Sequence, residues 1–354
     1  MRQVITSNGV ALRSLLAVAV GAIALTSCAS TAENTSTAPQ SAASPEESAG
    51  SATTPRPALP QVGVSTAGCT APDPTLTPGT TVTRTVPGAG GERTYLLHVP
   101  SGYTLGTAHP AVLTMHGMGT NAFLQLANTG ITDSADANGY VVIAPNAVDG
   151  RWALPEPGTS SPASADVEFI DQVMADASAA LCLDPARQYA SGMSMGSAMT
   201  LVLACQPQRT FAAFGGVGAA FYESVCAGAP PAPLIYFHGT GDDVVPFAGG
   251  TARGFQVEPV PEVMAEWAGH NECEPTPTEA ITSEVTLLAW TACADDAVID
   301  FYRIDGGGHT WPGSPITSNP AFAEFAGPTT TTVDATDAMW EFFQRYSLPT
   351  EATG

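Results

Sequence analysis

The pentapeptide Gly192-Met193-Ser194-Met195-Gly196 constrains the fold more than any other segment of this chain. A G-x-S-x-G sequence between a strand and a helix forms a turn so tight that the serine takes strained backbone angles. Any side chain at either glycine would collide with the neighbouring strand or helix. The flanking sequences fit this pattern, because residues 187–191 are strand-like and residues 195–205 are helix-like. We therefore predict that Ser194 Oγ stands clear of a sheet at a helix N-terminus, whose dipole favours developing negative charge.

A serine in such a turn becomes a nucleophile only with an adjacent base, and in this arrangement the acid and then the histidine follow the serine along the chain. The acid candidates are Asp242 and its neighbour Asp243, which come directly after an apolar run. The base candidate is His309, which follows three glycines and the last predicted strand. The remaining five histidines have positions typical of structural residues, namely His98, His109, His116, His238 and His270.

Two backbone amides are needed to stabilise the oxyanion of an acyl-transfer reaction. One is the amide of Met195, directly after the serine. The other is expected in the loop after an early strand, in His116-Gly117-Met118-Gly119, where we assign Met118. The side chains of Met118 and Met195 would then line a cleft or pack in the core.

The pattern of apolar runs predicts a single domain. Residues 111–115 and 140–144 are short and continuously apolar, which is typical of strands buried on both faces of a parallel sheet. Further strands are expected at 93–100, 187–191, 211–217, 234–238, 285–290 and 298–304. Helices are expected at 121–138, 166–181, 195–205, 260–269 and 334–346. Strands that alternate with helices indicate one doubly wound α/β domain with a mostly parallel central sheet.

The N-terminal region has the composition of an export signal followed by a tether. Residues 1–27 carry two Arg, an apolar stretch too short to span a bilayer, and Leu25-Thr26-Ser27 before Cys28, which resembles a bacterial lipobox. We expect a lipoprotein signal peptide with lipidation at Cys28, or an ordinary signal peptide with an incidental Cys. Residues 28–68 form a Ser/Thr/Ala/Pro-rich linker expected to be disordered, residues 69–347 the domain, and residues 348–354 a disordered tail.

Six cysteines remain after Cys28, and an even number in an exported protein suggests disulfides. Short loop closure favours Cys205–Cys226 and Cys273–Cys293, which leaves Cys69–Cys182 to hold the N-terminus of the domain. No C-x-x-C pair or Cys/His cluster has zinc spacing, so a metal site is not expected.

The net charge of the chain limits which molecules it can bind. The chain carries 33 Asp and Glu against 11 cations, all of them Arg, for a formal net charge of −22. Such a field repels phosphate backbones and anionic headgroups, so nucleic-acid binding is not expected and membrane contact is expected only through the N-terminal lipid. The acidity favours a neutral or weakly charged substrate, although it is equally well explained by composition bias.

The segments around these residues resemble the α/β-hydrolase esterases grouped with poly(3-hydroxybutyrate) depolymerases, feruloyl esterases and acetylxylan esterases. The matching segments are RTYLL at 93–97 with VP at 99–100, HG at 116–117, DPARQYASGMS at 184–194, HGTGDDVVP at 238–246 and GGHTWPG at 307–313. The family's acid stands two residues after the Thr, which selects Asp242 over Asp243. The family often has a second Gly where this chain has Ser197, and it usually has more aromatic residues near the oxyanion loop.

The resemblance implies hydrolysis of carboxylic esters through an acyl-enzyme, with Ser194 as nucleophile, His309 as general base, Asp242 as the orienting acid and no cofactor. Trp311 and Trp152 are then candidates for a wall on which the substrate stacks, or simply for rim or core residues. Polyester or hydroxybutyrate oligomers and feruloyl or acetyl esters of plant polysaccharide all fit as substrates. The alternatives are a non-catalytic surface-binding lipoprotein on a hydrolase scaffold and a serine peptidase. The oligomeric state does not follow from the sequence.

Overall fold

The computed structural model describes residues 67–88, 91–155, 164–208, 210–221, 226, 228–252, 254–280, 282–317 and 319–349. The predicted signal peptide, the lipidation site Cys28, nearly all of the linker and most of the tail lie outside the described residues. The domain begins with the short helix α1 (Ala67–Thr70), close to the boundary expected at Cys69.

Ten strands in the described part of the chain form one sheet, in the order β1-β2-β4-β3-β5-β6-β7-β12-β11-β10. The six central strands run parallel and supply the carboxyl ends on which a site can be built: β4 (Val141–Pro145), β3 (His109–Met115), β5 (Leu183–Met193), β6 (Ala213–Val217), β7 (Leu234–Gly239) and β12 (Ile299–Ile304). The flanking strands pair antiparallel: β1 (Thr80–Gly88) and β2 (Gly91–Val99) at one edge, β11 (Val285–Thr291) and β10 (Glu274–Ala280) at the other. The mostly parallel sheet confirms the predicted fold class.

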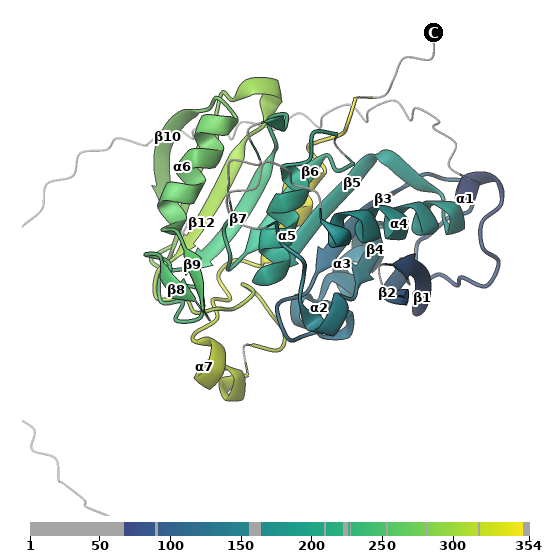
Figure 1. Cartoon of the computed structure of the whole chain (residues 1–354), viewed down its shortest axis with the longest axis horizontal. Coiled ribbons are helices and arrows are strands. Elements are labelled where there is room, and N and C mark those ends of the chain that lie inside the picture. Colours follow the sequence, from purple (N-terminus) through teal and green to yellow (C-terminus); the bar gives the residue numbers. More distant parts are fainter. Residues whose placement is uncertain are drawn as a thin grey trace, which may run out of the picture. The chain divides into compact units, whose positions relative to one another are not determined.

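The central strands, apart from the half-buried β12, are buried on both faces because their alternate side chains enter two different cores. Leu113 and Ile143 pack in one core with helices α4 (Ala165–Ala180), α5 (Met195–Ala204) and α6 (Val260–His270). Val112 and Val142 point the other way, into the core under α2 (Ala122–Thr129), α3 (Ile131–Asn138) and α8 (Ala335–Phe343). Figure 1 shows α5 and α6 in front of the sheet and the yellow C-terminal helix behind it.

Several local predictions were wrong. The single helix expected at 121–138 is two helices, because Gly130 takes a left-handed conformation (φ 62°) that ends α2 and begins α3. The edge strand β10 was missed since its sequence, EPTPTEA, contains two prolines, which are rare inside strands. The hairpin of β8 (Gly250–Ala252) and β9 (Phe255–Val257) and the helix α7 (Pro320–Ala326) were also missed.

The cysteines pair as predicted: Cys69 with Cys182, Cys205 with Cys226, and Cys273 with Cys293. Such bridges are typical of proteins that fold in an oxidising compartment outside the cytosol. No helix among the described residues is long and apolar enough to cross a membrane. Within the same residues, no three side chains of His, Cys, Asp or Glu gather as a metal site would require.

Candidate active site

Ser194 lies at the turn from β5 into α5, with φ 55° and ψ −126°. Two close approaches hold it there. A Cβ on Gly192 would lie 2.2 Å from the carbonyl oxygen of Gly196, and a Cβ on Gly196 would lie 2.1 Å from the carbonyl oxygen of Met115 in β3. The Ser194 amide donates to the carbonyl of Val217 at the end of β6, over 2.7 Å. The strained serine is therefore locked between three strand ends and the start of a helix.

The loop after β7 buries Asp242 and exposes Asp243. Asp242 Oδ1 accepts hydrogen bonds from the amides of Val244 (2.8 Å) and Val245 (2.7 Å), and Oδ2 accepts one from His309 Nδ1 (2.7 Å). Burial opposes ionisation of this carboxyl, but the hydrogen bonds from His238 and His309 outweigh it and hold the pKa of Asp242 well below its usual range. Asp242 is thus a charged carboxylate. It differs from its neighbour Asp243 in being buried, whereas Asp243 is exposed.

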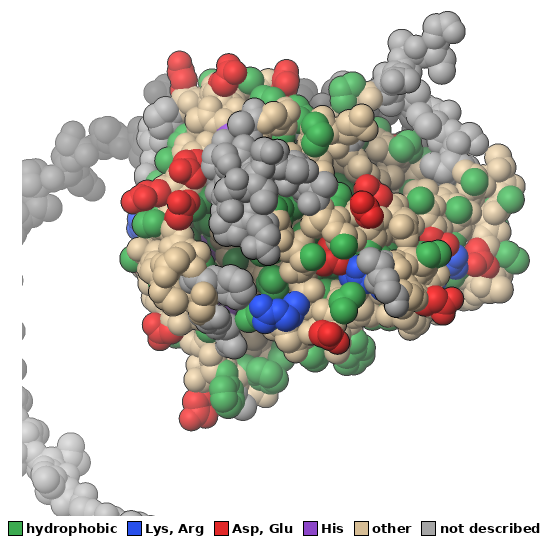
Figure 2. Space-filling model, viewed as in Figure 1, with side chains coloured by type: hydrophobic (Ala, Val, Ile, Leu, Met, Phe, Trp, Pro, Cys, Tyr) green, Lys and Arg blue, Asp and Glu red, His purple; other side chains and the backbone are tan. Residues whose placement is uncertain are grey.

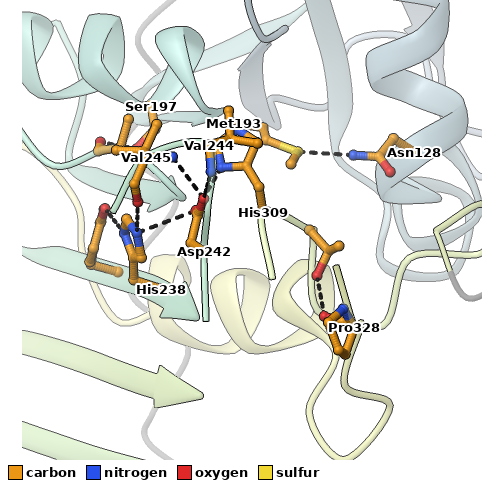
Figure 3. A network of polar contacts seen from close by, with 12 residues as sticks. Asn128, Met193, Ser197, His238, Asp242, Val244, Val245, His309 and Pro328 are labelled. Carbon is orange, nitrogen blue, oxygen red and sulfur yellow. Dashed lines mark hydrogen bonds and ion pairs between the residues drawn. The ribbon is translucent and has the colours of Figure 1, made fainter. Parts of the chain in front are cut away.

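His309 is fixed by the glycines before it. A Cβ on Gly308 would lie 2.1 Å from the carbonyl oxygen of Ala326 at the end of α7, so the loop packs tightly against that helix. Nδ1 donates to Asp242, which leaves Nε2 to accept a proton. A Cβ on Gly218, the residue after Val217, would lie 3.1 Å from the imidazole Cε1. The imidazole therefore packs on Gly218, which follows the Val217 carbonyl that accepts from the Ser194 amide; Figure 3 shows the contact of His309 with Asp242.

Two backbone amides are available beside the serine. Met195 is the first residue of α5, so its N–H has no carbonyl one turn before it. In the β3 loop the amides of Gly119 and Thr120 donate to carbonyls, whereas that of Met118 has no acceptor among the described residues. The loop lies against Ser194, because a Cβ on Gly117 would lie 3.2 Å from Ser194 Cβ.

Trp152 does not form a substrate wall; that prediction was wrong. Its side chain is only 2% exposed, its Nε1 donates to the carbonyl of His116 over 2.8 Å, and its ring packs against the His116 ring. His116 in turn accepts from the amide of Ala147 with Nε2 and donates from Nδ1 to the carbonyl of Gly117. Burial lowers the pKa of His116, which keeps it neutral in this role. These two side chains brace the loop that bears Met118.

Trp311 is also a core residue rather than a stacking wall, and the prediction was wrong for the same reason. The side chain is 1% exposed and belongs to the core under α8. Its Nε1 donates to Thr336 Oγ1, which itself donates to the carbonyl of Thr129. Trp311 therefore anchors the loop that carries His309 to α8 and α2.

Two polar residues of the site were not assigned a role by the sequence. Ser197, where the family often has Gly, is buried on α5 and donates to the carbonyl of Ala219, one residue after Gly218. His238 at the end of β7 lies 3.4 Å from Asp242 Oδ2 (Figure 3). The signal for His238 was its spacing, four residues before the acid candidate in HGTGD.

The fold together with the elbow serine and the buried carboxylate–imidazole pair defines a serine hydrolase of the α/β-hydrolase class. No family profile matches the chain. It is 27% identical over 260 residues to feruloyl esterase C of Emericella nidulans, covering 71% of this chain and 83% of the relative. It is 30% identical over 265 residues to NocK of Nocardia uniformis subsp. tsuyamanensis, which is named as a candidate esterase, covering 68% of this chain and 77% of that protein.

Among solved structures, the fold is similar to the acetyl xylan esterase from Aspergillus awamori, with a TM-score of 0.52 and 17% identity over 74% of this chain and 99% of that one. A thermostable esterase gives the same TM-score with 15% identity, over 76% of this chain and 63% of that one. The chain belongs to the α/β-hydrolase esterase family that includes these feruloyl and acetylxylan esterases, and it is a carboxylic ester hydrolase.

Proposed function

We propose that this esterase removes feruloyl or acetyl groups from plant polysaccharide through an acyl-enzyme formed on Ser194. The observation that carries the proposal is the 2.7 Å hydrogen bond between His309 Nδ1 and the buried carboxylate of Asp242, set beside an elbow serine. The substrate class is supported by relatives named as feruloyl and acetylxylan esterases.

In the proposed reaction, His309 Nε2 takes the proton of Ser194 as Oγ attacks the ester carbonyl. Asp242 holds the imidazole in the tautomer that leaves Nε2 free and stabilises the imidazolium that forms. The alcohol leaves with the proton from His309, and a water molecule repeats the sequence on the acyl-enzyme. No cofactor takes part.

The amides of Met118 and Met195 donate to the oxyanion of each tetrahedral intermediate in this scheme. Donors of this kind contribute about 3 kcal/mol each to transition-state stabilisation. The effect of these amides depends on how rigidly each one is held. The contacts of His116 with Gly117 and Ala147 hold the loop that contains Met118.

The cellular setting of the proposal is the outside of the cell. The three disulfides fit an exported domain. We propose that Cys28 carries lipid and residues 29–66 tether the domain to the membrane surface. The face in Figure 2 carries many acidic and few basic side chains, which suits an uncharged ester and disfavours nucleic acid.

The test is a substrate panel run on wild type and Ser194→Ala. We expect wild type to hydrolyse methyl ferulate or acetylated xylan at least tenfold faster, in kcat/KM, than a hydroxybutyrate trimer. Ser194→Ala is expected to lose all measurable turnover with an unchanged circular dichroism spectrum. Ser191→Ala is the matched control, because its hydroxyl donates to the Leu113 carbonyl inside the sheet and its loss leaves turnover within about threefold.

Each alternative predicts a different outcome of that panel. Full turnover by Ser194→Ala would refute the acyl-enzyme and leave a non-catalytic scaffold with a contaminating activity. A trimer rate above those of ferulate and acetylxylan would move the substrate class to polyester. Cleavage of a casein substrate, lost in Ser194→Ala, would indicate a peptidase instead.

A further inference from the structure

His238 is a second buried imidazole at the acid of the site. Its Nε2 lies 2.9 Å from the carbonyl oxygen of Val245 and 3.4 Å from Asp242 Oδ2, and its Nδ1 lies 2.8 Å from the hydroxyl of Tyr236 (Figure 3). The side chains of His238 and Asp242 are fully shielded from solvent, and Tyr236 is buried. The mechanism proposed above leaves this group unused.

Both ring nitrogens of His238 have a partner. The Val245 carbonyl can only accept, so Nε2 carries a hydrogen that it donates there, with Asp242 on the same side of the ring. Burial raises the pKa of Tyr236 far above its usual value, so its hydroxyl keeps its proton. That hydroxyl lies 2.8 Å from Nδ1 and holds the other side of the ring.

These contacts complete the shell of Asp242. Oδ1 accepts from the amides of Val244 and Val245, and Oδ2 accepts from His309 Nδ1 and lies 3.4 Å from His238 Nε2. An ionised carboxylate offers about four acceptor sites; three are filled by hydrogen bonds, and His238 Nε2 lies beside the fourth. His238 also holds the Val245 carbonyl, so it fixes both the carboxylate and the turn that carries it.

We propose that His238, oriented by Tyr236, is a positioning residue that sets the direction and proton affinity of Asp242, and through it of His309. This inference rests on the proposed function, because it presumes that Asp242 and His309 act on Ser194. His238 does not touch the reacting atoms, so its effect must appear in kcat rather than in KM.

The role of His238 has a pH-dependent consequence for the pair of Asp242 and His309. The titratable groups facing Asp242 are His309, from the loop after β12, and His238 with Tyr236 behind it, both from β7. Removing the His238 donor leaves the carboxylate less stabilised, so the proton affinity of the coupled pair rises. The acid limb of the activity profile then moves to higher pH.

The experiment compares His238→Leu and His238→Gln with wild type, using 4-nitrophenyl acetate and counting active sites by the acyl-enzyme burst. We expect His238→Leu to lower kcat per active site by about tenfold to a hundredfold, with KM within about twofold. Its acid limb is expected to move upward by at least half a pH unit. His238→Gln retains an N–H donor near the Nε2 position and is expected to recover most of both losses. Tyr236→Phe, which keeps the imidazole, is expected to lower kcat by about threefold.

Two controls separate positioning from folding. His98→Leu removes another buried imidazole, on β2, that bridges the hydroxyl of Thr81 on β1 and the carboxylate of Asp136 on α3. Tyr189→Phe removes a buried hydroxyl that donates to the Tyr346 carbonyl. Both are expected to lower thermal stability without changing kcat per active site or the acid limb.

Wild-type kcat and pH profile in His238→Leu and Tyr236→Phe, with Ser194→Ala inactive, would overturn the inference and leave the proposed function intact. If His238→Leu does not fold, Tyr236→Phe decides the matter, because it keeps the imidazole and removes only its partner. Unchanged kcat per active site and an unchanged acid limb in Tyr236→Phe then contradict the role. An active Ser194→Ala variant would instead refute the proposed function itself.

Discussion

At the carboxyl end of the sheet, the loops that bear Asp242 and His309 differ from the surface around them in burial and in hydrogen bonding. The loops after β7 and β12 are densely hydrogen-bonded around buried side chains, with Asp242 only 4% exposed. The surface around them is apolar and open: Phe325 on α7 is 82% exposed and Phe123 on α2 is 70% exposed. Figure 2 shows apolar side chains gathered where Figure 1 places α7. We therefore expect the reaction to depend on buried contacts that tolerate little change, and substrate selection to depend on an open surface that tolerates more.

The largest expected effect comes from the buried side. Asp242→Asn preserves the shape of the acid but allows its amide to donate to His309, which favours the wrong imidazole tautomer. We expect kcat to fall by about a thousandfold to ten-thousandfold with 4-nitrophenyl acetate. Asp243→Asn is the matched control on the exposed neighbour and is expected to stay within twofold. Equal losses in both variants would contradict the assignment of the acid.

Substitution of a glycine in the turn at Ser194 should strongly lower the stability of the fold. A Cβ on Gly196 would lie 2.1 Å from the carbonyl oxygen of Met115, so Gly196→Ala must displace α5 or β3. We expect it to lower the free energy of unfolding by more than about 3 kcal/mol, or to prevent folding, as measured by urea denaturation. Gly269→Ala in α6 meets open space and is expected to be neutral or slightly stabilising. A well-folded Gly196→Ala variant would show that the turn is looser than described.

How far the sequence predicted this molecule depends on how local the determining forces are. The elbow at Ser194 and the loop of His309 were predicted because short motifs with glycines at fixed offsets leave few backbone choices. The residues alone left Asp242 and Asp243 open, and the resemblance to the esterase family selected Asp242. The cysteine pairs followed from loop length. The central strands followed from apolar runs, which a parallel sheet requires on both faces.

The failures involve properties that only tertiary structure determines. Trp311 lies beside His309 and Trp152 follows a predicted strand, and nothing in their neighbours says whether an indole points into the core or into a cleft. Gly130 breaks a helix whose apolar pattern continues through it. The role of His238 depends on a contact between a strand end and a loop four residues later, and His109 or His98 would have fitted equally well by composition.

The acid also contributes to stability in a pH-dependent way. The pKa of Asp242 is lowered in the folded chain, so its ionised form stabilises the fold above the unfolded value of about 4. That contribution is lost as pH falls from about 4 toward the folded pKa. Thermal unfolding followed from about pH 5 down to about pH 2 should therefore show a steeper acid loss in wild type than in Asp242→Asn. Parallel curves would contradict the lowered pKa.

A substitution at Trp311 tests whether this side chain belongs to the buried core or to the substrate-binding surface. Trp311→Phe removes the hydrogen bond to Thr336 and leaves a small void in the core under α8. We expect a loss of about 1 to 3 kcal/mol in the free energy of unfolding, with KM for methyl ferulate within twofold. A raised KM at unchanged stability would instead place Trp311 in the substrate cleft and restore the stacking wall.

We expect the smallest effect from substitutions on the exposed apolar surface, where only KM should change. The end of α7 packs on Gly308, next to His309, so Phe325 stands at the rim of the site without contributing to the core. Phe325→Ala should leave the melting temperature and kcat unchanged, since exposed substitutions change stability by no more than about 0.5 kcal/mol. It should raise KM for a feruloylated oligosaccharide about two- to threefold, because part of an apolar contact is lost. Leu105→Ala, equally exposed but in the loop before β3 at the opposite end of the parallel strands, should change neither quantity. If both substitutions leave KM unchanged, the apolar surface over α7 takes no part in choosing the substrate, and specificity must arise closer to Met118 and Met195.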